Sequence, residues 1–201
     1  NALPSPPEPP PDPSPDPPQK PFDEDTPPSP PPLGIYAKTK LQGEALALKN
    51  NPHRTLICRV GNLYGPFGRN FPSTLLSRLQ DPHAHPSLRL DDTRLLTPTS
   101  TYSAALQILH LLRLDAPGGL YHLTCAGSAT WADFAAEICR QKEISPLYKT
   151  VSSQQLGLKA PRPHYHVLEN RRLQSLGLDI MPPWKDALTR YLDDPNDLLQ
   201  S

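Results

Sequence analysis

Long hydrophobic runs are absent from this chain of 201 residues. The longest apolar stretch, residues 104–112, is interrupted by Gln107 and His110 and is too short for a bilayer, which takes about 20 apolar residues. A signal-peptide pattern is missing as well. Lys plus Arg and Asp plus Glu number 20 each, so the net charge does not suggest a polyanionic partner. The sequence therefore predicts neither a membrane nor a nucleic acid as partner.

Cysteine and metal-binding clusters are scarce too. Cys58, Cys125 and Cys139 are odd in number, widely spaced and set in apolar segments, which is typical of reduced core thiols in a cytoplasmic protein. Two His-x-His pairs, at 83–85 and 164–166, have strand spacing, but no Cys or acidic cluster accompanies them. The sequence therefore predicts no metal site.

Proline is unevenly distributed, because residues 1–33 hold 16 of the 29 prolines. Proline lacks a backbone N–H and fixes φ, so this stretch builds neither a helix nor a sheet ladder. We expect residues 1–19 to be a disordered, Pro-rich segment, and residues 20–201 to hold one core of ordinary size. Because Asn1 stands where an initiating methionine would, we also expect the chain to be a fragment of a longer protein.

The remaining sequence alternates helical and strand patterns. Apolar residues at three-to-four spacing, with turn residues behind them, predict helices over residues 36–48, 100–114, 131–142 and 183–191. Short runs of β-forming residues predict strands over 54–60, which we expect to be buried, and 120–124. Thr130 is placed to cap the third helix. Helices alternating with strands favour an α/β fold with a parallel sheet.

Tyr36 and Lys40 give the clearest chemical signal. On a helix, positions i and i+4 lie on the same face. An ammonium beside a phenol stabilises the phenolate, so such a pair can transfer a proton. Pairs with this spacing are also common on helices that have no catalytic role, and the neighbouring motifs decide between the two interpretations.

Four segments carry a family resemblance. They are residues 20–28 (KPFDEDTPP), 36–44 (YAKTKLQGE), 59–71 (RVGNLYGPFGRNF), and 162–173 (RPHYHVLENRRL) with 182–188 (PPWKDAL). In this order they resemble the extended short-chain dehydrogenase/reductase superfamily, and within it the dTDP-4-dehydrorhamnose reductase family. The resemblance implies that residues 20–201 form the C-terminal half of a Rossmann-type parallel sheet and a small α/β substrate-binding subdomain. It is looser at residues 60–62, where Val-Gly-Asn replaces the Thr-Ser-Trp usual in the reductases.

The resemblance implies a reductase of 4-keto-6-deoxy sugar nucleotides in the cytoplasm, as a possible homodimer or with a partner enzyme. Tyr36 would donate a proton to the keto oxygen while NADPH or NADH supplies hydride, and Lys40 would bond the cofactor ribose. Arg59 and Asn62 would lie near the nicotinamide and the sugar. The implied substrate-binding residues are Asn62, Tyr64, Arg69, Asn70 and Arg162.

One part of such an enzyme is missing. No Gly-x-x-Gly-x-x-Gly follows an apolar strand, and the ten glycines are scattered. Without that turn and its helix, the chain has no helix N-terminus at which the cofactor pyrophosphate could bind. We therefore expect the chain alone to bind NADPH or NADH poorly and to be inactive by itself.

Two other interpretations remain open from the sequence. The chain could be a non-catalytic sugar-nucleotide-binding or regulatory module, similar to the regulatory subunit of methionine adenosyltransferase. It could also be a decayed reading frame with exposed apolar sheet edges. The intact Tyr36–Lys40 pair favours the enzyme, because a scaffold has no need for it.

Overall fold

The computed structural model describes residues 20–27, 34–80, 88–157 and 164–193, with the side chain of Gln80 left out. The Pro-rich segment 1–19 and the first His-x-His pair lie outside these residues. The helices are α1 (Gly34–Asn50), α2 (Phe71–Gln80), α3 (Thr101–Arg113), α4 (Trp131–Gln141), α5 (Arg171–Ser175) and α6 (Trp184–Asp193). The strands are β1 (Leu56–Val60), β2 (Asn62–Tyr64), β3 (Arg89–Asp91), β4 (Leu95–Leu96), β5 (Pro98–Ser100), β6 (Gly119–Leu123), β7 (Lys149–Val151) and β8 (Tyr165–His166).

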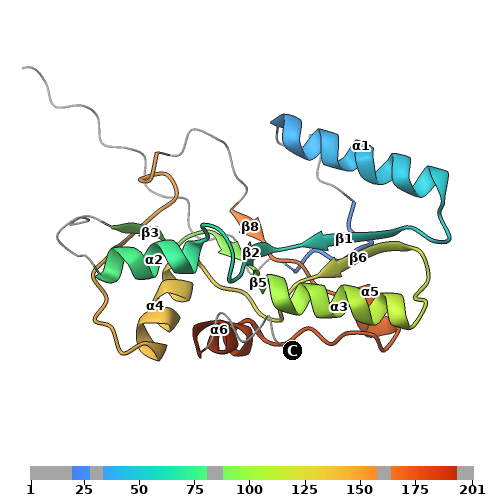
Figure 1. Cartoon of the computed structure of the whole chain (residues 1–201). Coiled ribbons are helices and arrows are strands. Elements are labelled where there is room, and N and C mark those ends of the chain that lie inside the picture. Colours follow the sequence, from blue (N-terminus) through green and yellow to red (C-terminus); the bar gives the residue numbers. More distant parts are fainter. Residues whose placement is uncertain (1–19, 28–33, 81–87, 158–163, 194–201) are drawn as a thin grey trace, which may run out of the picture.

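The described strands form four parallel pairs, β1–β6, β2–β5, β3–β7 and β4–β8. The longest pair joins β1 to β6 in a five-residue register from Leu56 opposite Gly119 to Val60 opposite Leu123. Parallel strands need a crossover, and α3 lies in the one that leads to β6 (Figure 1). The predicted α/β class with parallel strands is confirmed. The predicted helices are all present, within three residues at each end.

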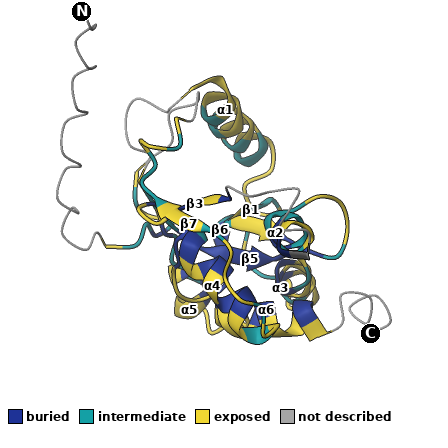
Figure 2. Ribbon diagram, turned by 90° about the vertical axis from the view of Figure 1, so that its left-hand side faces the viewer, coloured by how far each residue is buried: buried dark blue, intermediate teal, exposed yellow. Residues whose placement is uncertain are grey.

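Most of the core lies between α2, α4 and α6. Aromatic rings dominate it, with Tyr64 against both Phe134 and Tyr191, and Phe134 against Trp184. A second, smaller cluster lies under α3 and β6, made of Leu111, Tyr121, Leu123 and Leu173. Burial is therefore concentrated in the part of the chain that follows β2 (Figure 2).

Helix α4 begins with the cap that the sequence predicts. The Thr130 hydroxyl accepts from the Asp133 backbone N–H at 3.0 Å, and the Asp133 carboxylate accepts from the Thr130 N–H at 2.9 Å. This reciprocal box satisfies two backbone donors that a helix leaves unpaired.

We predict that Thr130→Ala lowers the free energy of unfolding by about 1 kcal/mol, the usual cost of losing such a cap. Urea unfolding followed by circular dichroism measures the change. Thr189→Ala is the matched control, because this exposed hydroxyl bonds a carbonyl within α6 and caps nothing. Equal effects of the two substitutions would show that the box adds nothing special.

Helix α1 and strand β1 are poorly covered, unlike the rest of the fold. No residue of α1 is buried, and β1 is half-buried with Val60 exposed. The prediction that the strand over 54–60 is buried was therefore wrong. The reason is visible in Figure 2, where α1 stands apart from the other helices. Among the described strands, β1 pairs with β6 alone, so the other edge of β1 has no neighbouring strand.

Helix α3 buries Leu111 but leaves its other leucines exposed. Gln107 is fully buried, donates its amide to the Leu178 carbonyl and accepts from the Ile180 N–H, both at 2.9 Å. Leu109 and Leu112 on the same helix are exposed. No helix in the described ranges is long and apolar enough to span a membrane.

Candidate functional site

Tyr36 and Lys40 lie in the first two turns of α1. The Lys40 ammonium is 5.6 Å from the centroid of the Tyr36 ring, within the range of a cation–π contact. The ring is 76% exposed, so a ligand can reach its hydroxyl. The structure thus brings the two residues together on one face of the helix, as the spacing predicts.

Arg59 lies near the end of β1, and Asn62 is the first residue of β2. The Arg59 guanidinium forms a two-point ion pair with Glu44 of α1, through Nε at 3.0 Å and Nη2 at 2.7 Å. Asn62 is exposed, and its backbone N–H donates to the Thr97 carbonyl at 3.1 Å. Arg59 therefore joins the site by holding α1, whereas Asn62 leaves its side chain open to solvent.

The proposed substrate residues do not gather in one place. Tyr64 is 3% exposed and packs in the core, where burial raises the pKa of its hydroxyl far above the usual range. Asn70 caps α2: its amide donates to the Gly65 carbonyl at 2.6 Å and its carbonyl accepts from the Ser73 N–H at 3.0 Å. These contacts give both residues structural roles, and a role toward substrate stays a prediction. Arg69 is exposed, and Arg162 lies outside the described residues.

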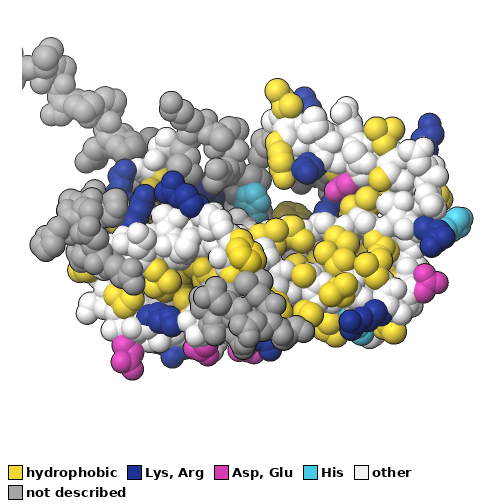
Figure 3. Space-filling view, in the orientation of Figure 1, with side chains coloured by type: hydrophobic (Ala, Val, Ile, Leu, Met, Phe, Trp, Pro, Cys, Tyr) yellow, Lys and Arg dark blue, Asp and Glu magenta, His cyan; other side chains and the backbone are white. Residues whose placement is uncertain are grey.

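A pocket of about 260 Å³ opens between α2, β3 and α4. Aromatic rings form part of its wall, and the centroids of Phe71 and Trp131 are 4.2 Å apart. Three arginines line it as well, Arg78, Arg89 and Arg94, and Nη1 of Arg89 donates to the Gln155 carbonyl at 3.4 Å. Figure 3 shows basic side chains gathered on this side of the molecule. Rings beside guanidinium forks suit a planar base that carries phosphates.

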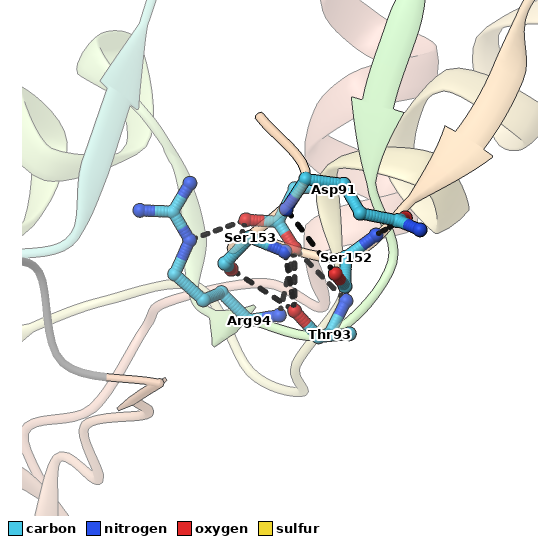
Figure 4. Close-up of polar contacts among 6 residues, drawn as sticks. Asp91, Thr93, Arg94, Ser152 and Ser153 are labelled. Carbon is cyan, nitrogen blue, oxygen red and sulfur yellow. Dashed lines mark hydrogen bonds and ion pairs between the residues drawn. The ribbon is translucent and has the colours of Figure 1, made fainter. Parts of the chain in front are cut away.

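A buried carboxylate fixes one side of the pocket (Figure 4). Asp91, 1% exposed, accepts from the Thr93 N–H at 2.9 Å, the Thr93 hydroxyl at 2.8 Å and the Ser153 hydroxyl at 2.6 Å. It also pairs with Arg94, which is 6% exposed. Burial alone raises the pKa of Asp91, but the hydrogen bonds from Ser153, Thr93 and Arg94 outweigh it and hold the pKa at about 2. The carboxylate is therefore ionised and rigidly placed.

The acidic segment 20–27 is anchored to a distant part of the chain. Asp23 pairs with Arg171 at 2.8 Å, and the Glu24 carboxylate accepts from the backbone N–H groups of His122 and Arg172 at 2.8 and 3.1 Å. Two of the four motif segments of the sequence thus meet in space, although about 150 residues separate them. Among the described residues, no group of three potential metal ligands occurs.

The sequence did not reveal the pocket between α2, β3 and α4. Its residues come from three separate elements, and Ser153 reaches Asp91 from 62 residues away. One local signal was available: the run Asp91-Asp92-Thr93 is typical of a turn in which the first carboxylate bonds the backbone two residues on. That signal indicates a turn and says nothing about a pocket.

Comparison with known proteins shows what the whole chain is similar to. A family model described as RmlD substrate binding domain matches residues 16–196. The chain is 32% identical to the Spore coat polysaccharide biosynthesis protein SpsK of Bacillus subtilis (strain 168), over 87% of this chain and 59% of that protein. It is also 32% identical to a dTDP-4-dehydrorhamnose reductase of Streptomyces griseus, over 85% of this chain and 56% of that protein.

Solved structures of reductases with the same name are also similar to the chain. A dTDP-4-dehydrorhamnose reductase from Clostridium acetobutylicum superposes with a TM-score of 0.79 at 33% identity, covering 91% of this chain and 61% of that one. The enzyme of the same name from Bacillus anthracis, in complex with NADP, gives a TM-score of 0.77 at 26% identity and covers 86% and 59%. The chain thus spans about three-fifths of the length of these relatives.

Proposed function

Because the chain belongs to the RmlD substrate binding domain family, we propose that it supplies the proton donor and the sugar-nucleotide site of a reductase. The family predicted from the sequence is confirmed. The proposed reaction is the reduction of a 4-keto-6-deoxy sugar nucleotide, of the dTDP-4-dehydrorhamnose type, with NADPH or NADH as reductant. The Tyr36–Lys40 pair on one face of α1 is the observation that carries the proposal.

The proton chemistry follows from that pair. When a keto group is reduced, its oxygen becomes an alkoxide and needs a proton. The exposed Tyr36 hydroxyl can donate one, and the Lys40 ammonium stabilises the phenolate that remains. Tyr36 then regains its proton from water. The hydride would come from NADPH or NADH, and the two side chains and water supply only the proton.

The substrate's nucleotide is assigned to the pocket between α2, β3 and α4. Phe71 and Trp131 offer ring faces for the base, and Arg78 and Arg89 offer guanidinium groups for the diphosphate. Arg94 is already paired with Asp91, so its part is to shape the wall.

The cofactor fits this chain only in part. Tyr36 and Lys40 suit a nicotinamide riboside, but the sequence has no glycine-rich turn for a pyrophosphate. We therefore expect weak binding of NADPH or NADH by the chain alone. A cytoplasmic location and a homodimer or partner enzyme stay predictions; the three free thiols support the first.

We predict that dTDP raises the thermal unfolding midpoint of the chain, whereas NADPH at the same concentration does not. A ligand at 100 times its Kd adds about 2.7 kcal/mol to stability. Arg78→Ala is expected to weaken dTDP binding about tenfold, the loss of one guanidinium–phosphate contact. Arg113→Ala, on α3 and away from the pocket, is the matched control.

Differential scanning fluorimetry and isothermal titration measure both effects. No shift with dTDP would contradict the nucleotide pocket. A micromolar Kd for NADPH would contradict the expectation that the cofactor site is incomplete. Binding of dTDP together with full activity of Tyr36→Phe in a complete reductase that carries this chain would support a non-catalytic sugar-nucleotide-binding module.

A further inference from the structure

Helix α1 is covered on one side only, where residues 37, 41, 44, 47 and 48 are half-buried. It has no buried residue, and Figure 3 shows open space between it and the body. Its one described side-chain ion pair with another element is Glu44 with Arg59 of β1. The remaining described bonds lie at its C-terminal end, where Asn51 and Thr55 bond back to the helix carbonyls and lead into β1. These bonds do not fix how the helix rotates about its own axis.

The Glu44–Arg59 pair joins one side of the helix to β1 at two points. Arg59 uses two nitrogens against two carboxylate oxygens, at 3.0 and 2.7 Å, and this fork geometry permits one orientation. Glu44 follows Lys40 by four residues and Tyr36 by eight, so the three share one face of α1. Whatever holds Glu44 therefore also sets the direction of Tyr36 and Lys40.

Other charged groups near Arg59 do not compete for it. His122 is its register partner on β6, and burial lowers the pKa of that imidazole, with the Arg59 charge adding to the effect. The Glu24 carboxylate is occupied by the backbone N–H groups of His122 and Arg172. Glu44 is thus the carboxylate to which the Arg59 guanidinium is bound in the described part of the chain.

We propose that Arg59 is a positioning residue, which acts through Glu44 to set the rotation of α1 and with it the placement of the Tyr36–Lys40 pair. The positioning role rests on the proposed function of the Tyr36–Lys40 pair. The Glu44–Arg59 link itself does not. A contact of Arg59 with the cofactor stays a separate prediction. A proton donor displaced by about 1 Å loses about a hundredfold in rate, so a helix without buried side chains needs such a link.

The test compares backbone hydrogen exchange of α1 in the full chain and in two variants. Glu44→Ala removes the link, and Arg59→Lys keeps the charge but loses the fork. We expect exchange in residues 34–50 to rise about fivefold in Glu44→Ala and less in Arg59→Lys, with α4 and α6 unchanged. Alanine is the best helix former, so faster exchange cannot reflect helix propensity. Lys38→Ala, on an exposed position of the same helix, is the control.

A second measurement reports on Tyr36 directly. In chain labelled with fluorotyrosine, the Tyr36 fluorine resonance is identified by its loss in Tyr36→Phe, and Glu44→Ala should shift it while Lys38→Ala should not. Unchanged exchange and an unmoved resonance in Glu44→Ala would overturn the proposal, whatever the activity. Faster exchange with a shifted resonance would support the Glu44–Arg59 link even if the reductase proposal failed, because neither measurement requires turnover.

Discussion

Asp91→Ala is expected to lower the free energy of unfolding by about 3–5 kcal/mol, the cost of breaking a buried ion pair by removing one partner. Asp91 is 1% exposed, and its carboxylate binds Thr93, Arg94 and Ser153. Alanine would leave the buried Arg94 guanidinium without its anion and two hydroxyl groups without their acceptor. Urea unfolding followed by tryptophan fluorescence measures the loss, since Trp131 and Trp184 lie in or beside the core.

Two further variants test the cause of that loss. Arg94→Met in the Asp91→Ala background removes the stranded charge, so it should recover part of the stability. Arg140→Ala breaks the Arg140–Glu137 pair, whose arginine is 70% exposed, and should cost no more than about 1 kcal/mol. If Asp91→Ala cost as little as Arg140→Ala, the buried network would not be the stabilising element that its geometry indicates.

The pH dependence gives an independent check. The pKa of Asp91 lies at about 2 in the folded chain, below its ordinary value of 3.8. Its contribution is therefore complete above about pH 4 and is lost as the pH falls toward 2. Asp91→Asn should flatten this part of the stability curve. Asp23, held at about 2 mainly by its bonds with Thr26 and Arg171, titrates in both proteins, so the difference isolates Asp91.

Local patterns explain which elements could be predicted from the sequence. Helix α1 and the capping box at Thr130 depend on residues within one or two turns, so spacing was enough to place them. Strands of two or three residues, such as β4 and β8, are too short to show any periodicity. They form because a distant parallel partner is present.

The candidate site likewise has residues that local spacing predicts and residues whose surroundings depend on tertiary packing. Tyr36 and Lys40 were found because i,i+4 neighbours meet on any helix. The motif indicates Tyr64 and Asn70 as substrate residues, which stays a prediction. Their neighbours in space also make one a core residue and the other a cap, and spacing along the chain shows neither contact. Helix α3 shows the limit most clearly: an apolar run predicts burial, yet Leu109 and Leu112 are exposed while Gln107 is buried together with Leu111. Tertiary packing decides which face of a helix is covered.

Tyr36→Phe is expected to lower the turnover of a complete reductase by about 10²–10⁴-fold, the usual contribution of a positioned general acid. The chain alone cannot be assayed if its cofactor site is incomplete. We would therefore replace the matched region of the Clostridium acetobutylicum reductase with this chain, since the two share 33% identity and a TM-score of 0.79. Oxidation of NADPH in the presence of the 4-keto sugar nucleotide is the measurement.

Tyr36 lies at the surface, so the substitution tests its hydroxyl without disturbing the fold. Its ring is 76% exposed, so removing the hydroxyl should change neither folding nor the pocket between α2, β3 and α4. KM for the sugar nucleotide should stay the same while kcat falls, because the hydroxyl acts on the transition state. Tyr148→Phe, a half-buried hydroxyl remote from α1, is the control. Full activity of Tyr36→Phe would remove Tyr36 as the proton donor, and the exposed pair on α1 would then be an ordinary helix-surface contact.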